Sequence, residues 1–127
     1  MKRALLSLLM PAAIALTAAG CKTEYDRTEI SNVKSGLPGG NMNYARIDVP
    51  VGGIVTSHIV SYDDSHDTMA VELHSKDEGI VQVANVVSEH DYAFVGMKPG
   101  ETEVEMRANG HLVLILRARV TPQPALP

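Results

Sequence analysis

The chain has 127 residues, one cysteine and a formal net charge of −4 at neutral pH. This length provides one ordinary domain and is too short for two. The excess of acidic residues excludes the basic surface that nucleic acid binding requires, and it disfavours electrostatic docking on anionic lipid.

Residues 1–20 have the three-part plan of a secretory signal peptide. Lys2 and Arg3 give a positive start, an uncharged apolar stretch follows, and small residues precede Cys21. A permanent membrane span is disfavoured, since the apolar stretch is at the short limit for crossing a bilayer and contains Pro11. Export therefore is the first prediction, and removal of the leader changes the formal charge to −6, with nine basic and fifteen acidic residues.

Cys21 is the only cysteine, so it has no partner for an intramolecular disulfide. The sequence Ala18-Ala19-Gly20-Cys21 resembles the lipobox of bacterial lipoproteins, although Ala18 stands where that family usually has leucine. The resemblance implies cleavage before Cys21 and covalent attachment of a diacylglycerol thioether and an N-acyl chain such as palmitate. It also implies a lipid anchor in the bacterial cell envelope. Lys22 replaces the aspartate that usually retains these proteins at the inner membrane, which favours the outer membrane.

Residues 21–44 are predicted to comprise the lipidated cysteine and a flexible tether. The stretch is polar, contains Gly36, Pro38, Gly39 and Gly40, and has no sustained apolar periodicity. A flexible coil of this length spans about 25 Å and would lift the domain away from the membrane. At the other end, residues 122–127 are rich in proline and form a predicted tail that cannot continue a strand ladder.

Residues 45–121 alternate apolar and polar side chains, which is typical of β-strands. Two turn signals are clear. Lys98-Pro99-Gly100 favours a type II turn with positive φ at the glycine, and Asn109-Gly110 favours a type I′ hairpin. The predicted strands lie near residues 47–51, 54–61, 69–73, 81–83, 91–97, 102–108 and 111–120. About seven strands in one all-β domain predict a two-layer sandwich.

The segments HSKDEGIVQV, FVGMKPGETEVEMRANG and LRARVTP resemble the bacterial immunoglobulin-like domain of the Big type. The resemblance covers residues 45–121 and implies an immunoglobulin-like sandwich that serves as a spacer, an adhesive module or a module that contacts carbohydrate. Leu73 occupies the place where many members have tryptophan. The GMKPGET segment also resembles the small β-domain of pilus-assembly secretins, so an accessory subunit of a pilus or secretion complex is the alternative.

Residues with catalytic or metal-binding chemistry are spread through the sequence without a recognised spacing. The five histidines do not pair at ligand spacing, and no Gly-x-Ser-x-Gly elbow is present. Asp63, Asp64 and Asp67 form a weak calcium candidate, because carboxylates in one loop suit a hard cation. Short acidic residues are also ordinary turn formers. The sequence therefore predicts no catalytic site, no zinc site and no bound cofactor beyond the lipid, and a small metal-dependent enzyme is the least favoured alternative.

The last predicted strand carries apolar residues on both faces. Val113 and Ile115 lie opposite the inward set, followed on their own face by Arg117 and Arg119. Continuous apolar runs indicate burial on both sides, whereas an exposed pair beside two arginines would suit a partner such as an envelope protein or glycan. The sequence thus predicts a non-catalytic envelope protein with one binding or spacer domain.

Overall fold

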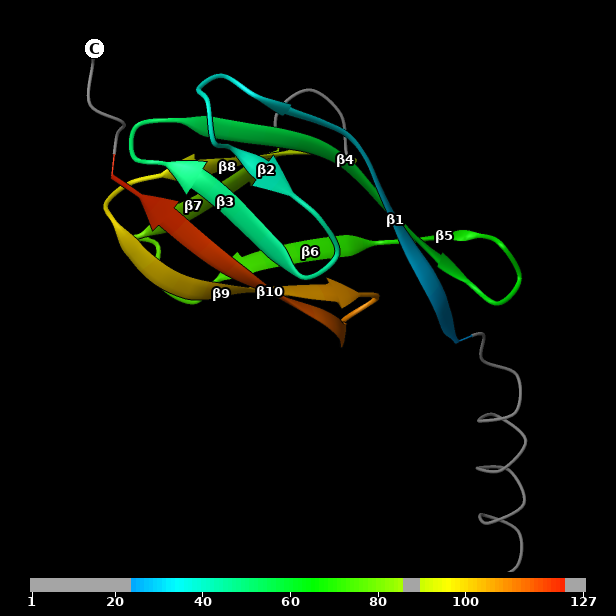
Figure 1. Cartoon of the computed structure of the whole chain (residues 1–127). Coiled ribbons are helices and arrows are strands. Elements are labelled where there is room, and N and C mark those ends of the chain that lie inside the picture. The colour runs from blue at the N-terminus through cyan, green and yellow to red at the C-terminus, as the bar shows by residue number, and fades with distance from the viewer. Residues whose placement is uncertain (1–23, 86–89, 123–127) are drawn as a thin grey trace, which may run out of the picture.

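The computed structural model describes residues 24–85 and 90–122, which form ten β-strands and no helix (Figure 1). The signal peptide, Cys21 and the tail beyond Pro122 lie outside these residues. In the described part, no helix has the length and apolarity needed to cross a membrane. The strands are β1 (Tyr25–Ser35), β2 (Asn41–Met42), β3 (Arg46–Pro50), β4 (Ile54–Asp63), β5 (Thr68–Met69), β6 (Val71–Ser75), β7 (Val81–Asn85), β8 (Asp91–Gly96), β9 (Gly100–Ala108) and β10 (His111–Thr121).

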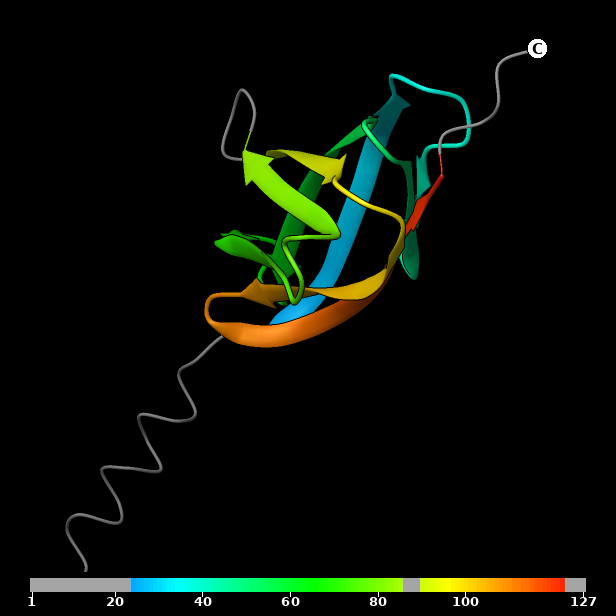
Figure 2. The same ribbon diagram turned by 90° about the vertical axis from the view of Figure 1, so that its left-hand side faces the viewer.

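The strands form two sheets that face each other (Figure 2). Sheet A has the order β1-β4-β8-β7, with β5 paired to the end of β4, and sheet B has the order β2-β3-β10-β9-β6. Neighbouring strands are antiparallel except β3 and β10, which run parallel. With β1, β4, β6, β7, β8, β9 and β10 taken as strands A, B, C, D, E, F and G, this is the immunoglobulin arrangement of ABED against CFG. The predicted all-β immunoglobulin-like sandwich is confirmed.

The core lies between the sheets and is built by the alternation seen in the sequence, because successive side chains of a strand point to opposite faces. Phe94, the only phenylalanine, is fully buried. Leu73, at the place of the missing tryptophan, is partly buried and packs against the core. The other fully buried apolar side chains among the described residues come from both sheets and are Ile47, Val49, Pro50, Val55, Ile59, Val81, Val104, Met106, Ala108, Leu116 and Ala118.

The prediction of a flexible tether over residues 21–44 is wrong for the part that the structure describes. Residues 25–35 form β1, which pairs antiparallel with β4 from Tyr25 opposite Asp63 to Ser35 opposite Val55. Two register shifts, between Tyr25 and Arg27 and between Ser31 and Lys34, interrupt the strand. Each bulge adds one residue and so breaks the two-residue period, which is why the stretch has no visible alternation.

The two predicted turns differ in outcome. Asn109 and Gly110 have φ values of 49° and 85°, as a type I′ hairpin requires. Asn109 also joins the neighbouring segment, because its Oδ1 accepts a hydrogen bond from the Ala70 amide at 2.8 Å. Gly100 has the predicted positive φ, but the value is 153° and the residue is the first of β9. It therefore begins a strand, where a type II turn would need a φ nearer 80°.

Candidate functional site

The outer face of sheet B contains most of the predicted partner patch, and a bulge in β10 decides which residues it exposes. Leu112 lies opposite Arg107 and Leu114 lies opposite Met106, so Val113 is the extra residue. Val113 and Leu114 both pack against the core. Leu112 and Ile115 are each 45% exposed. The bulge therefore turns Leu112 outward and Val113 inward, which is the reverse of simple alternation along the strand.

The structure divides the four residues of the predicted patch. Ile115, Arg117 and Arg119 are exposed on the outer face of sheet B, which matches the exposed alternative for these three residues. Val113 is turned inward, and Leu112 takes its place beside Ile115. Sequence alternation placed Leu112 inside, because a bulge cannot be seen in a run of apolar residues that are all acceptable on either face.

Lys76, which directly follows β6, forms a ladder of opposite charges with side chains of β9 on the same face. Lys76 Nζ lies 3.0 Å from Glu103 Oε1 and 3.9 Å from Glu105 Oε2, and Arg107 contacts Glu105 at 3.2 Å. The hydrogen bond to Glu103, aided by its charge, raises the pKa of Lys76 above the ordinary value. Because opposite charges lie next to one another, these contacts favour the observed register of β6 against β9.

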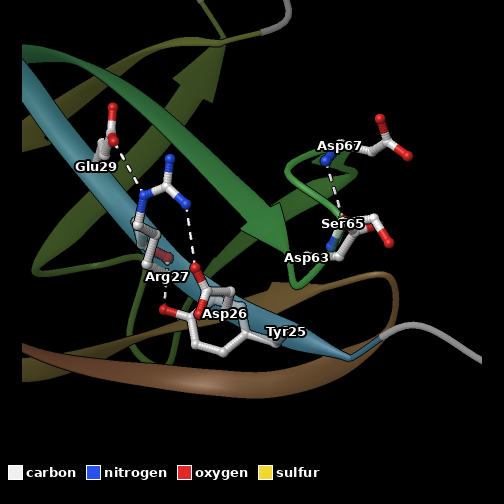
Figure 3. A network of polar contacts seen from close by, with 8 residues as sticks. Tyr25, Asp26, Arg27, Glu29, Asp63, Ser65 and Asp67 are labelled. Carbon is white, nitrogen blue, oxygen red and sulfur yellow. Dashed lines mark hydrogen bonds and ion pairs between the residues drawn. The ribbon is translucent and has the colours of Figure 1, made fainter.

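The weak calcium candidate lies in the turn between β4 and β5. Asp63 is only 7% exposed, and its Oδ1 accepts hydrogen bonds from the amides of Ser65 and Asp67, both at 2.9 Å. Figure 3 shows the Asp67 carboxylate pointing away from Asp63. Within residues 24–85 and 90–122, no three His, Cys, Asp or Glu side chains gather in a way that could hold a metal ion. Capping of a tight turn accounts for this arrangement of aspartates.

A further set of polar contacts, which the sequence analysis did not find, holds the start of β1 (Figure 3). Arg27 donates hydrogen bonds to Asp26 at 3.0 Å and Glu29 at 3.1 Å, and its guanidinium lies 4.4 Å from the centre of the Tyr62 ring. These carboxylates raise the pKa of Arg27. On the inner side, the hydroxyl of Thr28 bonds to those of Tyr25 and Ser61, each at 2.8 Å. The start of β1 is therefore fastened on both faces.

Two histidines that are distant in sequence also meet on sheet A. The rings of His58 and His90 have centroids 5.8 Å apart, and His58 Nδ1 lies 2.8 Å from Asp91 Oδ1. Antiparallel pairing of β4 with β8 places His58 opposite Asp91. Because this proximity arises from strand pairing, a search for local ligand spacing could not detect it. The pair is a polar cross-strand contact on a half-exposed face.

The fold resembles domains of surface layer proteins. A structure of the surface layer protein SbsC, domains 1–6, matches with a TM-score of 0.56 and 14% identity, over 82% of this chain and 14% of that one. The S-layer protein rSbsC(31-844) matches with a TM-score of 0.55 and 13% identity, over 79% of this chain and 13% of that one. Identity at this level shows the fold alone. No protein-family model and no curated protein matches the sequence.

Only the fold, and no function, can be inferred for this chain from its likeness to the S-layer structures. This chain spans about one seventh of the S-layer chains, so it corresponds to one small part of a long protein. A β-sandwich is used for many unrelated functions.

Proposed function

We propose that this chain is a lipid-anchored, non-catalytic protein of the bacterial cell envelope whose immunoglobulin-like domain is a binding or spacer module. The observation that carries the proposal is the position of the only cysteine, directly after an apolar leader and four residues before β1. A secreted chain with one cysteine has no internal disulfide partner for it. Acylation would account for the unpaired thiol of Cys21 and would hold the domain at a membrane surface.

The character of the domain supports the non-catalytic part of the proposal. The polar side chains of the sheet B ladder and of the Asp63 turn pair with one another or with backbone amides. Catalysis requires a nucleophile or an acid–base pair that converges on one cavity. The fold likeness to surface-layer domains is in keeping with a module that acts by contact at a cell surface. Ile115, Arg117 and Arg119 are the residues we assign to a partner, either an envelope protein or a glycan.

Mass spectrometry of the membrane fraction tests the anchor. The mature protein should begin at Cys21 and carry the mass of two or three acyl chains, because one chain alone gives only marginal membrane binding. Cys21→Ser should give an unprocessed or soluble product, with Ser7→Ala in the leader as the matched control that leaves processing intact. A Cys21→Ser product that is processed and remains in the membrane contradicts the proposal.

A further inference from the structure

Glu24, the first residue that the structure describes, is held against the turn between β4 and β5. Its carbonyl oxygen accepts a hydrogen bond from the Asp64 amide at 2.8 Å, and its amide donates to Asp64 Oδ1 at 3.4 Å. Tyr25 then enters the ladder opposite Asp63. Glu24 is therefore a fixed point of the chain beside the β4–β5 turn.

Only Lys22 and Thr23 lie between Cys21 and this fixed point. An extended residue spans at most about 3.6 Å, so the Cα atom of Cys21 lies within roughly 11 Å of that of Glu24. The headgroup layer on each side of a bilayer is itself about 5–8 Å thick. A chain anchored through acyl groups on Cys21 would use most of its reach to cross that layer.

The start of β1 shares one end of the sandwich with two turns. Figure 1 shows it beside the β4–β5 turn, and the β9–β10 hairpin reaches the same end because the Asn109 amide donates a hydrogen bond to the Ala70 carbonyl, just after β5, at 2.8 Å. The Thr28 hydroxyl contacts Met106 Sδ of β9 at 3.9 Å, in agreement with this placement. We call this end the anchor pole and define it as Glu24, residues 64–67 and residues 109–112.

We propose that the anchor pole rests directly on the bilayer surface, with Leu112 in contact with the lipid headgroup layer. This orientation rests on the proposed acylation of Cys21. Leu112 is 45% exposed and is the large apolar side chain at this pole. Its burial in the interface adds apolar contact to an anchor that already holds the pole in place.

The charges of the anchor pole specify the kind of surface. Glu24, Asp64 and Asp67 bring carboxylates to this end, and they repel anionic headgroups within a Debye length, about 8–10 Å at physiological salt. The occupant is therefore a zwitterionic bilayer. Replacing part of its lipid with anionic phosphatidylglycerol should weaken contact at low salt and leave it largely unchanged at high salt.

Fluorescence quenching of the acylated full chain in phosphatidylcholine vesicles tests the orientation. Since the lipid occupies the thiol of Cys21, an introduced cysteine is the only free thiol for a fluorophore. Ser65→Cys and His111→Cys label the anchor pole, whereas Gly36→Cys and Lys98→Cys label the far end, and all four positions are exposed. Nitroxide headgroup lipids should quench the two pole labels at least several-fold more than the two far labels. Equal quenching at the four positions overturns the orientation.

Two matched changes separate the contributions of the short linker and of Leu112. A flexible insert of 20 Gly and Ser residues between Thr23 and Glu24 spans about 25 Å and should remove the difference between the poles. Leu112→Ser should reduce quenching at residue 111, whereas Ile54→Ser should not, although Ile54 is also 45% exposed. Ile54 begins β4 and lies at the far end.

Measurement of acylation keeps this proposal distinct from the one on which it rests. Protein that carries no acyl chains and fails to float with vesicles overturns the lipid anchor, and the orientation with it. Acylated protein that floats but shows equal quenching at both ends overturns the orientation alone. Acylated protein whose pole labels become more strongly quenched on anionic vesicles at low salt contradicts the assignment of a zwitterionic surface.

Discussion

The strands β1 and β10 are equally long, with 11 residues each, and both contain bulges, yet their environments differ. β10 pairs with β3 on one side and β9 on the other, and Leu116 and Ala118 are fully buried. Among the strands that the structure describes, β1 pairs with β4 alone, and Ile30 and Val33 are only partly buried. A central strand needs an apolar residue at every inward position, whereas an outermost strand needs apolar residues at only a few of its inward positions.

This difference explains why the sequence of an outermost strand can resemble that of a flexible linker. Partial burial tolerates the charged residues of β1, and each of its bulges shifts the inward positions by one residue. What remains is a set of β-branched and aromatic residues at uneven spacing, Tyr25, Thr28, Ile30 and Val33, which are partly buried. Uneven spacing of such residues in a polar stretch next to a domain is therefore compatible with a bulged outer strand.

The largest contrast between the two strands should appear on truncation of their core side chains. Leu116→Ala in β10 should lower the free energy of unfolding by about 2–5 kcal/mol, because it leaves a cavity in a fully packed site. Ile30→Ala in β1 should cost about 1–2 kcal/mol, since water can reach part of the site. Urea denaturation of the purified variants measures both. Equal losses would show that β1 is packed as firmly as β10.

A second prediction concerns the hydroxyl contacts that join β1 to the core. Thr28→Val removes the partner of the Ser61 hydroxyl, which is fully buried. Leaving a buried polar group without a hydrogen bond costs about 1–3 kcal/mol. Adding Ser61→Ala removes the stranded group and should recover most of the loss, which thermal melting can follow. A double variant less stable than Thr28→Val would contradict this account of how β1 is held.

The smallest effects should come from the bulge of β10. Val113→Ser should cost about 1 kcal/mol because Val113 packs against the core. Leu112→Ser should stay within about 0.5 kcal/mol, as exposed substitutions usually do. Chemical denaturation of the two single variants side by side provides the measurement. The reverse order of stabilities would place Leu112 inside and restore the simple alternation expected from the sequence.

The sequence contained enough information to predict the sandwich, since the core strands alternate and the Asn109-Gly110 hairpin has a strong local signal. Three features of the structure could not be predicted from the sequence. The strand β1, the inward turn of Val113 and the meeting of His58 with His90 depend on bulges or on pairing between distant segments. Local periodicity carries no information about either. The lipid anchor and the partner residues remain predictions.

The outer border of β1, which is its edge away from β4, affects how neighbouring copies of the protein can interact when they are crowded. An outermost strand offers unpaired backbone groups to which another chain can add a strand. Here the two bulges bend that border, Glu29 and Lys34 place charges along it, and the Tyr44 hydroxyl accepts a hydrogen bond from the Ile30 amide at 3.1 Å. The proposed lipid anchor would confine the molecules to two dimensions and raise their encounter rate. An irregular, charged border of this kind would let neighbouring copies collide without fusing their sheets.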